Sequence, residues 1–117
     1  MIGSPPDRKS TRLTSYIEEN IGDIASAQEV AEVVDVSYET LRKRFRREKG
    51  IPIGTYIRQK RIDEARRLLI KTEDPVYAVC WKVGFSSDSN GIRTFKRETG
   101  MTMGEYRRRY REEESRG

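Results

Sequence analysis

Basic side chains are concentrated in two stretches of this sequence. Six of the thirteen residues at 37–49 are lysine or arginine, and Arg93, Lys96 and Arg97 form a second basic run. Their guanidinium and ammonium groups are donors that suit phosphate oxygens and the O6 and N7 acceptors of guanine. With a net charge of +5 and a pI near 9.5, the chain has the charge expected of a protein that binds a polyanion.

The two basic stretches belong to an internal repeat, which indicates that one module occurs twice. The segment from Phe45 to Tyr56 aligns with the segment from Phe95 to Tyr106, 50 residues further on, and Phe, Arg, Glu, two Gly and Tyr are identical. A single basic helix is more simply explained as an ordinary solvated face. Two copies at a fixed spacing favour a binding function.

The composition limits the chemistry that the chain can perform. It contains no histidine and one cysteine, which excludes an internal disulfide and histidine general-base catalysis and limits any metal site to oxygen ligands. Cys80 lies on an apolar stripe without a histidine to activate it, so we interpret it as a core residue. No apolar run of about 18 residues and no signal region occur. We expect no cofactor, no membrane association and a reducing, cytoplasmic location.

Helical periodicity places the basic stretches on helices, and no alternating pattern predicts a strand. We therefore expect an all-α chain of seven helices, with the first at 8–22. The expected inward-facing residues include Leu13, Ile17, Val30, Ala31, Val33, Tyr38, Leu41, Phe45, Tyr56, Leu69, Val79, Cys80, Val83, Phe95 and Tyr106, with Trp81 in part.

Capping residues indicate where the helices begin and end. Ser26 and Glu29 form a capping box, and Asp74 before Pro75 is a helix start signal. The other expected caps and stops are Ser37 and Gly50 for the first basic helix, and Ser86 or Ser87 and Gly100 for the second.

Two short helices joined by a tight turn, the second exposing polar residues, form a helix-turn-helix unit. The second helix of such a unit enters the major groove with its early residues on base edges, and later residues contact phosphates. The base-reading residues predicted in this way are Glu39, Arg42, Lys43, Asp88, Ser89, Ile92 and Arg93. The predicted phosphate contacts are Ser37, Arg46, Arg47, Ser87, Lys96 and Arg97.

Two longer strings of residues resemble the AraC/XylS family DNA-binding domain. The first runs from Ala31 to Leu69, and the second joins Val79-Cys80-Trp81-Lys82-Val83-Gly84-Phe85 to Arg93-x-Phe95-Lys96, Gly100 and Tyr106-Arg107. The resemblance implies two helix-turn-helix subdomains joined by a rigid central helix, with the two recognition helices in adjacent major grooves. It implies a transcription regulator, typically an activator that recruits RNA polymerase, and the same base-reading positions.

Most members of this family carry a sensor or dimerisation domain before the DNA-binding unit. We therefore expect this chain to be a monomer by itself. It is either a single-domain regulator or the C-terminal half of a larger one, and in the second case a sensor domain would allow a dimer. The expected organisation is a disordered linker or expression remnant at 1–7, a first helix-turn-helix subdomain at 8–51, a linker helix at 52–71, a second subdomain at 72–111 and a frayed tail at 112–117.

The sequence departs from the family pattern at three residues. Gly91 stands where the family usually has a bulky apolar residue, so we expect weaker packing of that helix. Ile92 replaces a small or polar residue and would contact thymine methyls or turn inward. Asp35 replaces a common turn glycine.

Two other classes of function stay open at this point. A protein-interaction module would use the basic helices to bind an acidic partner without DNA. An enzyme with the family domain attached, such as a methyl-accepting repair protein, would need a reactive Cys80. The inward position of Cys80 argues against the enzyme.

Overall fold

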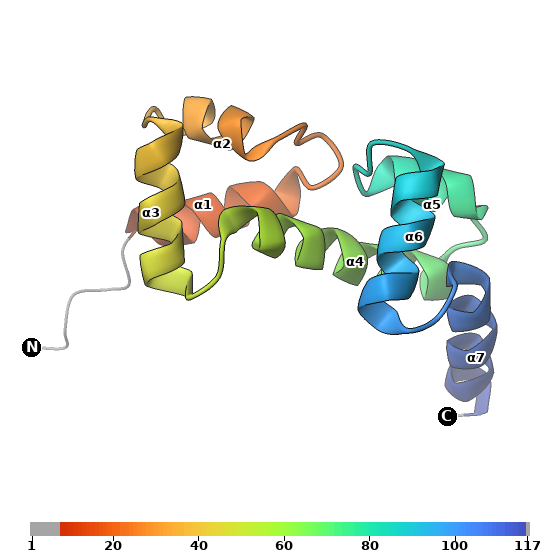
Figure 1. Ribbon diagram of the computed structural model, residues 1–117. Helices are drawn as coiled ribbons and strands as arrows, with labels where there is room; N and C mark the ends of the chain where they lie inside the picture. The colour runs from red at the N-terminus through yellow and green to blue at the C-terminus, as the bar shows by residue number, and fades with distance from the viewer. Residues whose placement is uncertain (1–7, 117) are drawn as a thin grey trace, which may run out of the picture. The chain divides into compact units, whose positions relative to one another are not determined.

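The computed structural model describes residues 8–116, with side chains described for residues 13–114. Seven helices and no strand occur within residues 8–116, which confirms the all-α class (Figure 1). The expected disorder of residues 1–7 lies outside the described residues. The helices are α1 (Arg8–Glu19), α2 (Ala27–Val33), α3 (Tyr38–Lys49), α4 (Ile53–Lys71), α5 (Val76–Lys82), α6 (Asp88–Thr99) and α7 (Met103–Arg116).

The contacts divide the chain into two units inside α4, between Gln59 and Lys60. The first unit contains α1, α2, α3 and the beginning of α4, and the second contains the rest of α4 with α5, α6 and α7. Each unit has its own buried cluster of apolar side chains. In each, a short helix, a tight turn and a 12-residue helix follow one another, which confirms the two helix-turn-helix motifs.

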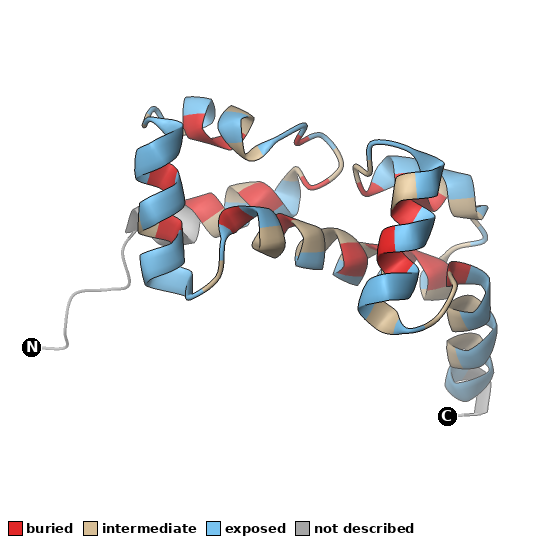
Figure 2. Cartoon of the chain, viewed as in Figure 1, coloured by how far each residue is buried: buried red, intermediate tan, exposed pale blue. Residues whose placement is uncertain are grey.

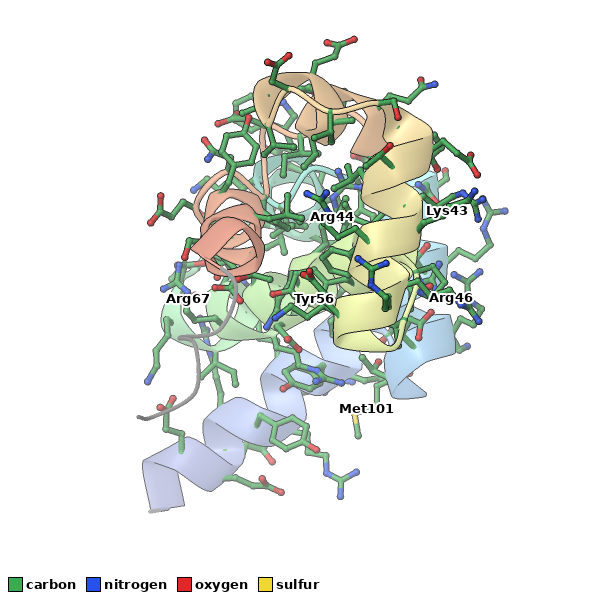
Figure 3. All side chains as sticks on the ribbon, turned by 90° about the vertical axis from the view of Figure 1, so that its left-hand side faces the viewer. Lys43, Arg44, Arg46, Tyr56, Arg67 and Met101 are labelled. Carbon is green, nitrogen blue, oxygen red and sulfur yellow. The ribbon has the colours of Figure 1, made fainter. Side chains whose placement is uncertain are left out.

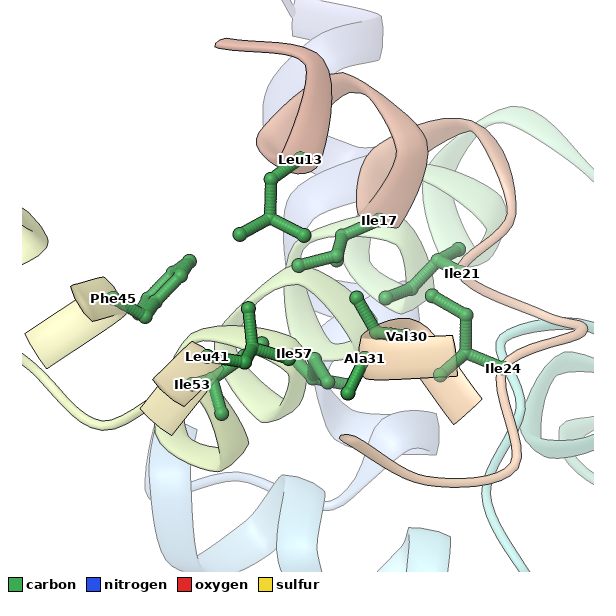
Figure 4. Close-up of a cluster of buried hydrophobic side chains, with 10 residues drawn as sticks. All are labelled: Leu13, Ile17, Ile21, Ile24, Val30, Ala31, Leu41, Phe45, Ile53 and Ile57. Atoms are coloured by element: carbon green, nitrogen blue, oxygen red, sulfur yellow. The ribbon is translucent and has the colours of Figure 1, made fainter. Parts of the chain in front are cut away.

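The core of the first unit is formed by apolar stripes on four helices (Figure 4). Figure 2 shows these buried residues as narrow stripes on helices whose other faces are exposed. Phe45 packs edge-on against Tyr56, with ring centroids 5.2 Å apart. The second unit repeats this pair with Phe95 and Tyr106 at 5.4 Å. Such aromatic pairs stabilise a fold by ~0.5–1.5 kcal/mol beyond the area they bury, so both phenylalanines have the core function predicted for them.

Serine caps and left-handed glycines fix the ends of the two longer helices. Ser37 Oγ accepts a hydrogen bond from the Thr40 N–H at 3.1 Å, and Ser87 Oγ accepts one from the Asn90 N–H at 3.0 Å. Ser87, and not Ser86, is therefore the cap of α6. Gly50 and Gly100, both with φ of 79°, end α3 and α6 in the left-handed region, as expected. Asp35, at φ 56°, adopts the positive φ that its turn requires, and aspartate tolerates this better than most residues.

Three residues expected to face inward are exposed: Val33 (53%), Tyr38 (39%) and Trp81 (77%). The reason is the 100° step between successive helical residues. The buried stripe of α2 is Val30 and Ala31, and that of α5 is Val79 and Cys80, so Val33 and Trp81 fall beside these stripes. Tyr38 lies on the Arg42 side of α3, four residues before it, and not on the Leu41 side.

Three helix ends differ from those expected: the end of α1, the start of α5 and the end of α7. α1 ends at Glu19 and not at 22, because residues 20–23 form a turn that the Asp23 N–H closes onto the Asn20 carbonyl at 2.8 Å. α5 has Pro75 as its N-cap without a side-chain cap bond. Asp74, expected to cap it, instead accepts a hydrogen bond from Lys82 Nζ at 2.8 Å.

α7 continues to Arg116 instead of fraying after residue 111. Lys71 of α4 contacts Glu114 at 2.5 Å. Arg107 and Arg111 donate to the last carbonyl oxygens of α4 and its following turn, with Arg107 Nε 2.8 Å from the Leu69 oxygen and Arg111 Nε 3.3 Å from the Ile70 oxygen. These contacts satisfy carbonyl groups that the helix end leaves without an intrahelical partner, and they hold α7 against α4.

Candidate nucleic-acid interface

The first part of α3 presents one acidic side chain, Glu39, that contacts two basic side chains, Arg42 and Lys43. Glu39, Arg42 and Lys43 are all exposed, and Arg42 Nη2 donates to Glu39 Oε1 at 2.6 Å, while Lys43 Nζ lies 3.6 Å from the same oxygen. The hydrogen bond from Arg42, followed by the charge of Arg42, lowers the pKa of Glu39 below its usual value. The carboxylate is therefore ionised at neutral pH, and it pairs with the Arg42 guanidinium on the exposed face.

The later residues of α3 add further positive charge. Arg46 and Arg47 are exposed, and Figure 3 shows Lys43 and Arg46 projecting from one side of the helix while Arg44 projects from the other. A hollow of about 370 Å³ lies between α3 and the first residues of α4, within the first unit. It is lined by Tyr38, Arg42, Arg46, Pro52, Ile53, Gly54, Thr55 and Arg58.

α6 presents a different chemistry from α3. Asp88, Ser89 and Arg93 are exposed, and Ile92 is 42% exposed. Ile92 has therefore not turned inward, and the exposed face of α6 carries an apolar side chain where α3 carries Arg42. Further along, Lys96 is exposed, and Arg97 lies 3.6 Å from its neighbour Glu98.

Gly91 allows α6 to lie close to the preceding helix, and the expectation of weakened packing there was wrong. A Cβ atom added at Gly91 would lie 2.7 Å from Cys80 Sγ and 2.9 Å from Cδ2 of Phe85. These two side chains already fill the space that a larger residue would occupy. Gly91 is itself buried, so no void is left beside α6.

All the predicted base-reading and phosphate-contacting residues lie on the exposed faces of α3 and α6 or at their N-caps. Their division between bases and phosphates stays a prediction. Sequence reasoning missed Tyr38 and Arg58, which share the hollow with Arg42 and Arg46. The spacing of residues 38, 42 and 46, four apart, was a usable signal, because such residues share one helix face.

The Cys80 thiol is buried in the core of the second unit. Cys80 is 1% exposed, and burial raises the pKa of its thiol, so the reactive thiolate is disfavoured. Within residues 8–116, no group of three or more His, Cys, Asp or Glu is placed to hold a metal ion. None of the helices in the part of the chain that the structure describes is long and apolar enough to cross a membrane.

Sequence comparison connects this geometry to known regulators. A family model described as a helix-turn-helix domain matches residues 30–109, more than half of the chain. The multiple antibiotic resistance protein MarA of Escherichia coli (strain K12) is 30% identical over 84 residues, which cover 72% of this chain and 66% of MarA. The match thus spans slightly less than two thirds of that relative.

Comparison with solved structures also finds regulators with a similar fold. The C-terminal domain of the two-component response regulator yesN from Fusobacterium nucleatum has a TM-score of 0.79 and 32% identity, over 83% of this chain and 95% of that one. A Chromobacterium violaceum transcriptional regulator, described among AraC-type DNA-binding domain-containing proteins, has a TM-score of 0.75 and 29% identity, over 85% of this chain and 88% of that one. The chain belongs to the AraC/XylS family of DNA-binding transcription regulators, as its paired helix-turn-helix domain.

Proposed function

We propose that this chain recognises a specific double-stranded DNA sequence with two recognition helices, α3 and α6, placed in adjacent major grooves. The observation that carries the proposal is the repetition of one exposed, capped and glycine-ended helix in both units. Successive major grooves on one face of DNA are about 34 Å apart. The continuous 19-residue helix α4 connects the two units, as a bipartite reader requires.

The two helices are proposed to read different base chemistry. On α3, Arg42 and Lys43 offer donors for guanine, and Glu39 both orients Arg42 and can accept from cytosine N4. On α6, Arg93 again suits guanine, while Ile92 suits the methyl group of thymine. A binding site with a guanine-rich box and a box containing thymine follows from these side chains.

Several further properties are proposed from membership of the family. The chain acts as an activator that contacts RNA polymerase. It is located in the cytoplasm, associated with the nucleoid. It is not an enzyme and needs no cofactor. The isolated chain binds as a monomer. Residues 8–51 and 72–111 form the two DNA-binding subdomains, and 52–71 links them.

Two substitutions test the proposed base contacts. Arg42→Ala and Arg93→Ala should each weaken binding to a selected duplex by ~1–3 kcal/mol and relax the preference at one base position. The control is Arg67→Ala, which removes an exposed arginine of α4 paired with Glu64 at 2.6 Å and should leave DNA affinity unchanged. Fluorescence anisotropy with labelled duplexes measures the DNA affinity of all three variants. Unchanged site-specific affinity in both test variants would contradict the proposal.

Salt dependence separates DNA binding from the alternative of a protein-interaction module. Binding dominated by phosphate contacts weakens by orders of magnitude between low and moderate salt. The interaction module would be supported instead if DNA selection enriched no duplex and the chain still bound an acidic protein at high salt.

A further inference from the structure

Ile92 is an exposed aliphatic side chain on one of the two proposed recognition helices. The large apolar side chains that are exposed in the described part of the chain are Val33, Tyr38, Tyr77, Trp81 and Ile92. Only Ile92 among them is an aliphatic residue on α3 or α6. Single exposed apolar residues are ordinary on protein surfaces, and this one is distinguished by its place on α6, where α3 carries Arg42.

The bases of DNA offer this side chain one kind of apolar group in the major groove. Among the four standard bases, thymine alone presents a methyl group there, at C5, and cytosine presents its N4 amino group. Methylation of cytosine at C5 places the same methyl group at the same ring position. Burial of apolar surface against such a methyl group is favourable, so Ile92 gives α6 a means of distinguishing methylated from unmethylated cytosine.

Asp88 adds a hydrogen-bond acceptor one helical turn before Ile92. Both side chains are exposed, and residues four apart lie on one helix face. The carboxylate can accept a hydrogen bond from the N4 amino group of cytosine, but it has no donor for the O4 acceptor of thymine. 5-Methylcytosine is therefore the base whose major-groove edge carries both groups that suit this face. α3 has Tyr38 and Arg42 at the equivalent positions, 50 residues earlier, and offers no such combination.

We propose that α6 recognises 5-methylcytosine, and that methylation of cytosine at C5 strengthens binding of the chain to its DNA site. Ile92 packs against the C5 methyl group, and Asp88 accepts a hydrogen bond from the N4 amino group of a cytosine in the same box. The methyl group thereby regulates binding through α6 and not through α3. This inference rests on the proposed DNA-binding function.

The test places cytosine and 5-methylcytosine at matched positions of a selected duplex. The α6 box is the one whose binding Arg93→Ala weakens, and each of its positions carries in turn a cytosine–guanine pair, either unmodified or methylated at C5 of the cytosine. Burial of one methyl group corresponds to about a fourfold change in affinity. We expect methylation at one position of the α6 box to raise the affinity, measured by fluorescence anisotropy, by this factor. Methylation of the α3 box should not raise it.

Two serine variants show whether Ile92 is responsible for the gain. Ile92→Ser removes the apolar side chain from α6 and should abolish the gain from methylation. Val33→Ser, which replaces an exposed aliphatic residue of α2, should retain it. Serine is tolerated at exposed helical positions at a small cost in stability, and circular dichroism confirms that both variants are folded.

Replacing thymine by deoxyuridine in the α6 box removes the thymine methyl group and provides a reference. A loss of affinity on this replacement, without a gain from 5-methylcytosine, would show that α6 reads thymine alone and would overturn the inference. No gain from methylation at any position, or a gain that Ile92→Ser retains, would also overturn it. Failure of the unmodified chain to bind any duplex would instead overturn the proposed function itself, so the two failures are distinguishable.

Discussion

Replacing Gly91 by alanine tests how α6 is positioned, because the backbone of α6 lies against two side chains at this point. The added Cβ would approach Cys80 Sγ to 2.7 Å and Phe85 Cδ2 to 2.9 Å, which is closer than such atoms approach in folded proteins. Cys80 is buried in the core of the second unit, so the helices or these side chains must shift. Overpacking of this kind destabilises a protein by ~1–3 kcal/mol.

Helix propensity acts in the opposite direction. Alanine is more favourable than glycine inside a helix by about 1 kcal/mol, so the two effects partly cancel. We expect the free energy of unfolding of the second unit to fall by about 1 kcal/mol. Gly104 provides the control: an added Cβ there meets no atom within 4 Å, so Gly104→Ala should stabilise the same unit by ~0.5–1 kcal/mol.

Urea unfolding followed by circular dichroism measures both variants, and the midpoint and the slope m are compared with those of the unmodified chain. A third variant, Cys80→Ala with Gly91→Ala, removes the sulfur that the new Cβ would meet. The Gly91 substitution should then cost less than it does alone. If Gly91→Ala stabilises the chain as much as Gly104→Ala, the close approach of α6 is refuted as the reason for this glycine.

Three further predictions concern the second unit. Trp81→Ala should change the unfolding free energy by no more than about 0.5 kcal/mol, because the side chain is 77% exposed; a loss above about 2 kcal/mol in thermal unfolding would show that it is buried. Ser87→Ala should destabilise the start of α6 by about 1 kcal/mol and speed hydrogen exchange of the Asn90 amide, and unchanged exchange would contradict the cap. The hydrogen bond from Lys82 lowers the pKa of Asp74, so the ionised Asp74 stabilises the folded chain above its unfolded pKa of about 3.9. This stabilisation is lost as the pH falls through the lower pKa of the folded chain. Asp74→Asn should therefore reduce the loss of stability below about pH 4 in urea unfolding, and an unaltered pH dependence would refute this contribution.

Much of the architecture could be predicted because short-range chemistry determines it. The serine caps at Ser37 and Ser87 and the stops at Gly50 and Gly100 act within one helical turn, and apolar stripes such as Leu41 and Phe45 follow from the helical period. Because the module is repeated, each of these local features occurs twice in the sequence. The exposed positions of Arg42 and Arg93 followed from the same helical geometry.

The remaining features depend on contacts between elements, which periodicity does not specify. Gly91 suggested weaker packing of its helix only because the positions of Cys80 and Phe85 against it were unknown. Tyr38 was expected inside because it is aromatic, yet it lies beside Arg42 and Arg46 at the hollow. The continuation of α7 past Arg111 depends on its contacts with the end of α4, which lie about 40 residues away in the sequence.

Selection of bound sequences from a random pool of duplex DNA, at physiological salt, tests the central claim most directly. Two engaged recognition helices predict a motif of two short boxes whose centres are one helical turn, about 10–10.5 base pairs, apart. Weakening of one box by Arg42→Ala and of the other by Arg93→Ala would assign α3 and α6 to their halves. Selection that enriches no sequence, or only a single box unaffected by Arg93→Ala, would contradict the account of a bipartite DNA reader.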